Sequence, residues 1–461
     1  MKRVLFAGLL AGLGFAPTIS AAEGLSQSAS ASVPRLIIST DIAAGLVDTH
    51  GGQSLVPVPF DADHGYTSDT NVVPQDFDDG LAVAAALNMD AAGLVDILAI
   101  VPTFGNATLP AEMAVARFIT QTLKGRDDIP VVAGALLPAG QIFNPTATWF
   151  DGSPVKVTGR NGSFAAACRN PGVEKMEQIL LQPGSFGMPS KVTILAIGPA
   201  TDIACLLLTS PKSALKQIEE IIFLASQLDG EVTEINGIPI NDFNVRMDPI
   251  AAAMALAVDR VNVPMRFMTF QLTSGMSQKG NIFAWNKDTY PGPPRPATKQ
   301  QITSYRWLIK ASKARREYFT SIFGTPEGPF DQFTLIAALR PDLFDCVRGR
   351  VYLQMCPYPA WSKKYPVDAN GDPTQEPYNA ANNPCPNHGG IYSESLSVVP
   401  AVIFATQSTA KKGKVVKGKD GIDGNLPTFG GKPARKALVC TGFVSEAAKQ
   451  MFKDLLTTWT W

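Results

Sequence analysis

VDILAIVPTFGNATLPAEMAVARFITQTL, residues 95–123, is the stretch that decides the fold. It begins with a continuously apolar run (95–101), which is typical of a strand covered on both faces. A Gly-Asn pair and Pro110 follow, and residues 112–123 are then helix-like. A buried strand followed directly by a helix is half of a βαβ unit, which favours a parallel sheet.

The same pattern recurs along the chain. Four further apolar runs are predicted as strands: RLIIST (35–40), KVTILAIG (191–198), EEIIFLAS (219–226) and MRFMTFQL (265–272). Helix-like segments follow Asp79 and Asp248. The alternation predicts an α/β fold with an open, mostly parallel, Rossmann-like sheet and helices on both faces. Three segments interrupt it and are predicted as surface insertions, at about 42–75, 140–170 and 355–395.

The composition and net charge of the chain indicate which kinds of molecule it binds. Of the 461 residues 45% are apolar, which is enough for a single domain over 34–460 to bury a core. Forty basic and forty acidic residues give a net charge of zero. Such a chain has no long-range field to attract nucleic acid or an anionic membrane. We therefore expect a small-molecule ligand at a local site, and a homo-oligomer is compatible with the sequence.

The N-terminus is typical of an export signal. Lys2 and Arg3 precede an apolar run that ends at Phe15, and small residues follow up to Ala22. The run is too short for an ordinary membrane span. We expect residues 1–22 to be a cleaved signal peptide and the mature chain to be periplasmic or secreted, without membrane attachment.

The six cysteines fit an exported chain, in which disulfides are permitted. Cys346, Cys356 and Cys385 flank or lie in one Pro/Asn-rich stretch, and we expect them to staple it. Cys205 lies in the apolar run ACLLL and is expected to be ordinary core packing. The pairing cannot be deduced from the spacing alone.

Polar residues follow the predicted strands or open the next helix. They are Asp41, Asp78, Asp79, Asn106, Thr201, Asn236, Asp242, Asn244 and Asp331. Ligands bind beyond the carboxyl ends of the strands in such sheets. Carboxylates that converge there repel one another unless a cation neutralises them. Because all these groups are oxygen donors, they indicate calcium or magnesium, and calcium tolerates the more irregular shell that loops supply.

Each of these residues also has a purely structural interpretation. Asp78, Asp79 and Asp331 could stabilise helix N-termini, and Thr201 could cap a helix. Asn106 and the Asn236-Gly237 pair could be turn residues. The functional interpretation gains weight because the whole set falls at the same end of successive strand–helix units.

These segments together resemble the inosine/uridine-preferring nucleoside hydrolase family. Its D-x-D-P-G-x-D-D signature looks split here into STDIAAG (39–45) and FDDGLAVAAAL (77–87). Further similar segments are VPTFGNATL (101–109), LAIGPATDIA (195–204), NGIPINDFNVRMDPIAAAMAL (236–256) and PFDQFTLIAALRPDLF (329–344). No single segment is unique to the family, but their order and spacing are specific.

The resemblance implies a hydrolase of N-ribosyl bonds with bound Ca²⁺. It implies that Asp41 is both a calcium ligand and the general base, and that Asp79, Thr201 and Asp331 complete the calcium site. The residues implied to bind the nucleoside are Asp78, Asn106, Asn236, Asp242 and Asn244. Asp76 remains an alternative to Asp41 because the signature is split.

Three positions depart from the family pattern: Ser39 replaces an Asp, Asp242 a Glu, and Phe330 a His. That His helps the base to leave in members that have it, whereas Phe330 could stack on a base. We therefore expect a preference for purine ribonucleosides, whose bases leave easily. His50 and His64 lie in a predicted insertion and could replace the missing acid. A non-catalytic nucleoside-binding protein and a hydrolase of another ribosyl compound are the alternatives.

Overall fold

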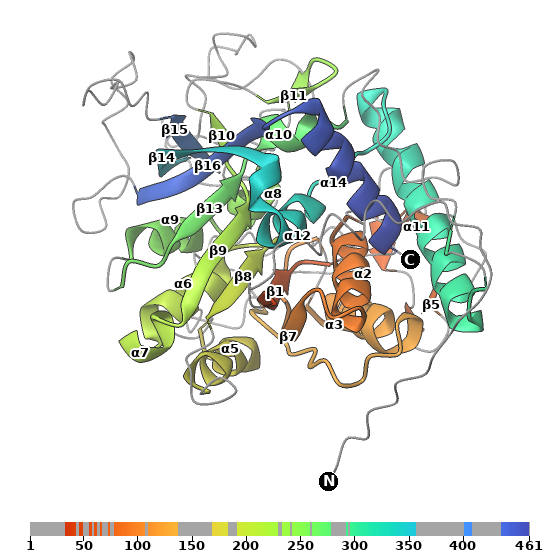
Figure 1. The fold of residues 1–461 in the computed structure, drawn as a ribbon, viewed down its shortest axis with the longest axis horizontal. Helices are drawn as coiled ribbons and strands as arrows, with labels where there is room; N and C mark the ends of the chain where they lie inside the picture. The colour runs from red at the N-terminus through yellow and green to blue at the C-terminus, as the bar shows by residue number, and fades with distance from the viewer. Residues whose placement is uncertain are drawn as a thin grey trace, which may run out of the picture. The chain divides into compact units, whose positions relative to one another are not determined.

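One large sheet, in the order β10-β15-β14-β16-β13-β9-β8-β1-β7, organises this computed structural model (Figure 1). Neighbouring strands are parallel from β16 through to β7. These strands are β1 (Arg35–Thr40), β7 (Asp96–Pro102), β8 (Val192–Ala196), β9 (Ile218–Leu224), β13 (Met265–Met268) and β16 (Arg435–Phe443). The predicted open, mostly parallel sheet is confirmed.

The structure describes residues 33–42, 46–48, 55–57, 60–61, 65–66, 72–73, 78–106, 109–136, 168–182, 191–228, 233–239, 242–258, 261–277, 292–293, 296–355, 401–407 and 435–460. The predicted signal peptide lies outside these residues, as do Asp76, His50 and His64 and most of each predicted insertion. Val33–Trp461 form one unit of the chain.

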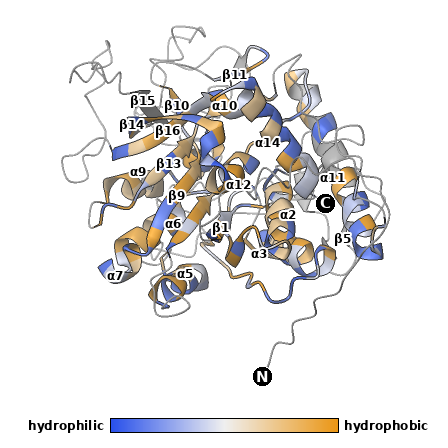
Figure 2. Ribbon diagram, viewed as in Figure 1, coloured by the Kyte–Doolittle hydropathy of each residue, from blue (hydrophilic) through white to orange (hydrophobic). Residues whose placement is uncertain are grey.

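Helices cover both faces of the sheet (Figure 1). On one face α2 (Asp78–Ala91) contacts both α12 (Gln332–Leu339) and α14 (Glu446–Trp459). On the other face α6 (Thr201–Thr209) contacts α5 (Pro171–Leu181) and α9 (Pro249–Ala257). Figure 2 shows hydrophobic residues gathered along the strands between these layers.

Shorter elements join this frame. The other helices are α3 (Leu109–Arg117), which continues as the π-helix η1 (Phe118–Leu123), α7 (Lys212–Leu215), α8 (Phe243–Met247), α10 (Phe270–Ser274), α11 (Lys299–Phe323) and the 3₁₀ turn η4 (Pro341–Leu343). The short strands are β2 (Leu46–Asp48), β3 (Leu55–Pro57), β4 (Phe60–Asp61), β5 (Gly65–Tyr66), β6 (Val72–Val73), β10 (Gln227–Leu228), β11 (Glu234–Ile235) and β12 (Ile238–Pro239). In the described part of the chain, no helix is both long and apolar enough to span a membrane.

Two features of the sheet differ from the predicted strands. The run 265–272 is only half strand, because the Thr269 side chain accepts a hydrogen bond from Leu272 N and starts α10. β14 (Phe344–Met355) and β15 (Ala401–Gln407) extend the sheet, and β14 is antiparallel to both of its neighbours. Charged residues such as Arg348 and Arg350 interrupt the apolar pattern of β14, so periodicity did not reveal it.

Two disulfides in the described residues correct the expected roles of the cysteines. Cys205 on α6 is bonded to Cys168, so it is more than core packing. Cys346 is bonded to Cys440, across from it on the neighbouring strand, and does not pair within the Pro/Asn-rich stretch. Both pairs join residues that the fold brings together and the sequence keeps apart, which spacing could not reveal.

The end of α14 is held to α2 and η1 by two side chains. Asn88 on α2 donates from Nδ2 to the Trp459 carbonyl at 2.8 Å. Lys124, directly after η1, donates from Nζ to the Thr460 carbonyl at 3.4 Å. Burial lowers the pKa of the Lys124 ammonium to about 7.

We predict that Lys124 makes stability depend on pH in the alkaline range. The unfolded chain keeps a lysine pKa of about 10.4, so between this value and about 7 it binds a proton that the folded chain does not. The free energy of unfolding should therefore rise with pH in that window, by about 2–4 kcal/mol relative to Lys124→Met. Urea unfolding of both proteins at neutral pH and at about pH 9.5 measures this, and parallel pH profiles would contradict it.

Candidate active site

Asp41 lies immediately beyond the carboxyl end of β1 and is fully buried. Its carboxylate oxygen Oδ2 accepts hydrogen bonds from the backbone N–H and the side-chain amide of Asn106, both at 3.2 Å. The same amide donates to the Asp41 carbonyl at 3.3 Å. Asn106 follows β7, the strand next to β1, so the sheet brings together two residues that are 65 positions apart.

Two glycines leave the space that the Asp41 side chain and backbone occupy. A Cβ on Gly105, after β7, would lie 2.1 Å from Asp41 Oδ2. A Cβ on Gly198, after β8, would lie 2.7 Å from the Asp41 backbone nitrogen. Both distances are far inside contact range, so only glycine fits at either position without a shift. The two glycines therefore leave room for Asp41 between the ends of β7 and β8.

Three further carboxylates form a cluster that does not include Asp41. Asp78 and Asp79 open α2, Asp331 immediately precedes α12, and one oxygen of each lies within 4.8 Å of the others. All three are buried. The Thr40 hydroxyl donates to Asp79 and so connects the cluster to the residue before Asp41. Buried carboxylates this close repel one another, and the arrangement fits a bound cation.

Asp331 occupies the N-cap position of α12, but its side chain makes no capping hydrogen bond to that helix. The carboxylate instead belongs to the cluster with Asp78 and Asp79.

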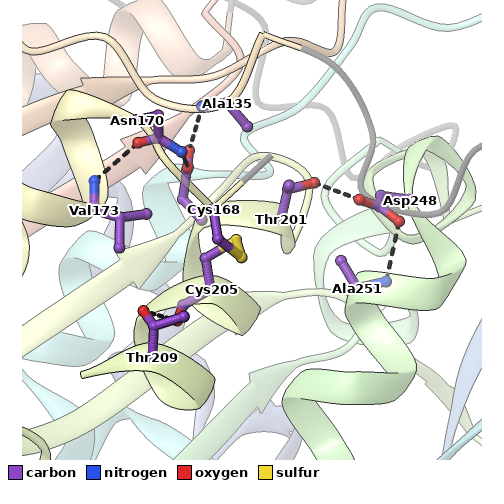
Figure 3. Close-up of a disulfide and its surroundings, with 10 residues drawn as sticks. Ala135, Cys168, Asn170, Val173, Thr201, Cys205, Thr209, Asp248 and Ala251 are labelled. Carbon is purple, nitrogen blue, oxygen red and sulfur yellow. Dashed lines mark hydrogen bonds between the residues drawn. A yellow bond between two sulfur atoms is a disulfide. The ribbon is translucent and has the colours of Figure 1, made fainter. Parts of the chain in front are cut away.

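Thr201 opens α6 at the end of β8, and its hydroxyl donates to Asp248 Oδ2 at 2.6 Å (Figure 3). Asp248 also caps α9 by accepting from Ala251 N at 3.0 Å. Both residues are fully buried. The bond ties the first turns of two helices together and orients the start of α6.

The next residue, Asp202, is a second buried anchor. Its carboxylate accepts from Ala135 N at 3.1 Å and from Asn170 Nδ2 at 2.8 Å. Burial raises the pKa of the Asp202 carboxyl to about 6, and the hydrogen bonds from Ala135 and Asn170 oppose that rise. The Cys168–Cys205 disulfide lies close to these bonds in Figure 3. The bond from Thr201, the bonds to Asp202 and the disulfide at Cys205 therefore all hold the N-terminal half of α6.

Asp242 and Asn244 lie on the start of α8. The two oxygens of Asp242 accept from Val245 N at 3.2 Å and from Ser226 N at 2.9 Å. Ser226 has a φ of 92°, an uncommon conformation for a non-glycine residue, and this hydrogen bond helps to hold it. Asn244 Nδ2 donates to the Ile197 carbonyl at 2.9 Å, and the side chain lines a pocket with Gly198.

Asn236 and Phe330 have different surroundings. Asn236 lies in the exposed turn between β11 and β12, with a φ of 50°, and its Nδ2 donates to the Phe323 carbonyl at 2.9 Å. This is the plain-turn interpretation, and a role in ribose binding stays a prediction. Phe330 is buried next to Asp331, with its ring centroid 6.3 Å from that of Phe270.

Sequence reasoning missed the residues that support these groups: Thr40, Ser226, Asp248, Asp202 and Gln332. Only Asp248 carried a signal, since an Asp-Pro pair before an apolar run is typical of a helix N-terminus. The others are ordinary residue types whose partners lie far along the chain.

We predict that Gly105→Ala destabilises the protein because the new methyl group overlaps the Asp41 carboxylate. The free energy of unfolding should fall by about 1–3 kcal/mol, the usual cost of overpacking. Gly442→Ala is the matched control, since nothing lies within 4 Å of a Cβ there. Denaturant unfolding of both variants measures this difference. Equal stability of the two would contradict the close contact between Gly105 and Asp41.

Comparison with known proteins agrees with this arrangement. The family model described as inosine-uridine preferring nucleoside hydrolase matches residues 68–371, more than half of the chain. That segment contains the acidic cluster, and Asp41 precedes it. The pyrimidine-specific ribonucleoside hydrolase of Citrobacter koseri is 28% identical over 301 residues, which cover 63% of this chain and 82% of that protein.

Two solved structures share the fold. A plant nucleoside hydrolase has a TM-score of 0.50 and 16% identity, and an inosine-guanosine nucleoside hydrolase has a TM-score of 0.50 and 14% identity. Each alignment covers 92% of this chain and 99% of the other. The chain therefore belongs to the inosine-uridine preferring nucleoside hydrolase family and is a hydrolase of N-glycosidic bonds.

Proposed function

We propose that this protein is an exported, calcium-dependent hydrolase that cleaves ribonucleosides into ribose and the free base. The observation that carries the proposal is the buried cluster of Asp78, Asp79 and Asp331 at the carboxyl end of the sheet. The cluster is linked to Thr40 by a hydrogen bond from that residue to Asp79. The next residue, Asp41, is a fully buried carboxylate that two hydrogen bonds from Asn106 hold in one orientation.

The donor set fits a hard cation. Asp79 and Asp331 would hold it with carboxylate oxygens, Asp41 with a third, and Thr201 with its backbone carbonyl. No thiolate or imidazole belongs to this set, which disfavours zinc, and helix starts and loops supply the irregular oxygen shell that calcium accepts. The chemistry that such an ion supplies is positive charge, which holds sugar hydroxyls and lowers the pKa of a neighbouring water.

Asp41 would take the proton from the attacking water. Two hydrogen bonds from Asn106 to the same oxygen, Oδ2, orient the carboxylate. Gly105 and Gly198 leave the space that this residue occupies between the ends of β7 and β8. A positioned general base of this kind contributes about 10²–10⁴-fold to a rate.

Other polar side chains of the candidate site would bind the sugar. Asp78, a member of the cluster, would accept a hydrogen bond from a ribose hydroxyl. Asn244 has a side-chain oxygen with no hydrogen-bond partner among the described residues, while its Nδ2 donates to the Ile197 carbonyl. Asp242 is already bonded to two backbone N–H groups, yet each carboxylate oxygen can accept a second bond.

The leaving base meets an aromatic residue where the family has a histidine. Phe330 adjoins Asp331 in the chain and packs toward Phe270, so it offers an apolar ring and no proton. We expect it to stack on the base. Without an acid at this position the enzyme favours bases that leave easily, which motivates the preference for purine nucleosides.

Calcium removal and Asp41→Asn test the chemistry together. We expect EDTA to abolish ribose release and added calcium to restore it, and Asp41→Asn to lower kcat by about 10²–10⁴-fold. Asp454→Asn, an exposed acid on α14, should leave kcat unchanged. Full activity in EDTA would refute the calcium site, and full activity of Asp41→Asn would refute the base.

The base preference is tested by comparing inosine with uridine. We expect a higher kcat/KM for inosine, and we expect Phe330→His to raise kcat/KM for uridine more than that for inosine, since a histidine can protonate the base. The similar protein of Citrobacter koseri is pyrimidine-specific, so a higher kcat/KM for uridine is the alternative outcome. Comparable turnover of inosine and uridine by the unaltered enzyme would contradict the purine preference.

Export is supported by two independent features. The N-terminal sequence has the charged, apolar and small-residue regions of a signal peptide. The described part of the chain contains two disulfides, which persist in oxidising compartments. We expect mass spectrometry of protein from its native host to show a mature chain that begins at Glu23, whereas a retained Met1 would contradict cleavage.

A further inference from the structure

Gln332 lies at the junction between the two halves of the acidic cluster. It is the first residue of α12, directly after Asp331, and it is fully buried. Its Nε2 donates to the backbone carbonyl of Asp78 at 2.8 Å, across 254 positions of sequence. One side chain therefore connects the helix start that carries Asp331 to the helix start that carries Asp78 and Asp79.

The chemistry of this bond fixes the orientation of the amide. A backbone carbonyl can only accept, so the nitrogen of Gln332 must face Asp78. The amide oxygen is buried and has no hydrogen-bond partner among the described residues. Burying such an oxygen is unfavourable, and an apolar side chain of similar size would avoid it. Core packing therefore does not explain a glutamine at this position.

We propose that Gln332 is a positioning residue that sets the spacing between Asp331 and the Asp78–Asp79 pair and thereby the affinity of the cluster for calcium. This inference rests on the proposed calcium site. Three buried carboxylates repel one another, and that repulsion separates α2 from α12 unless something opposes it. The Gln332 amide joins the two helix starts before an ion binds, so the ion meets a site whose spacing is already set.

The test uses the full chain and measures calcium binding directly. Isothermal titration with calcium gives Kd for the unaltered protein, for Gln332→Met, which keeps the length and removes the donor, and for Gln332→Asn, which is too short to reach Asp78. We expect Kd to rise by about 10–100-fold in both variants, as is usual when a group that orients metal ligands is lost. The calcium-dependent rise in Tm should shrink accordingly.

Gln227→Met is the matched control. Gln227 is also a fully buried glutamine, its Oε1 accepts from Thr233 N at 3.3 Å, and it lies on β10 at the edge of the sheet farthest from β7. We expect this variant to lower Tm without calcium and to leave the calcium Kd unchanged.

Two outcomes would count against the account, and they are distinct. If Gln332→Met and Gln332→Asn lower Tm as the control does but keep the calcium Kd of the unaltered protein, Gln332 is structural and the inference is wrong. If the unaltered protein itself binds no calcium, the proposed calcium site has failed. Circular dichroism of each variant verifies that a weak Kd reflects a folded protein.

Discussion

Repulsion among buried carboxylates is the constraint on which the rest of this structure depends. Asp78, Asp79 and Asp331 each place an oxygen within 4.8 Å of the others, and Thr40, the residue before Asp41, donates a hydrogen bond to Asp79. Like charges at such distances raise one another's pKa or require a counter-charge. The fold gathers them because parallel strands end at one edge and the following helices start there. A cation is the partner that such a group of oxygens suits.

The residues around the acidic cluster and Asp41 hold the candidate site in place. Thr40 and Asn106 attach Asp79 and Asp41 to the ends of two neighbouring strands. Gly105 and Gly198 leave the space that Asp41 fills. Thr201, Asp248 and the Cys168–Cys205 disulfide fix the start of α6 on the opposite face. Each is a modest interaction, and together they pre-organise one charged site.

Periodicity predicted the parallel part of the sheet well, because buried parallel strands are continuously apolar and their helices follow at once. It identified β1, β7, β8, β9 and the start of β13. It missed the antiparallel β14, whose charged residues break the pattern. The cluster residues were predictable because they follow strands, whereas Gln332 and the disulfide partners depend on contacts between distant segments that no local pattern records.

Anomalous scattering from a crystal of the active protein grown with calcium tests the central claim most directly. The account predicts one strong peak in contact with carboxylate oxygens of Asp79 and Asp331, with Asp41 and the Thr201 carbonyl completing the shell. A crystal of active protein with no cation among Asp78, Asp79 and Asp331, or with the cation held by other residues, would contradict it.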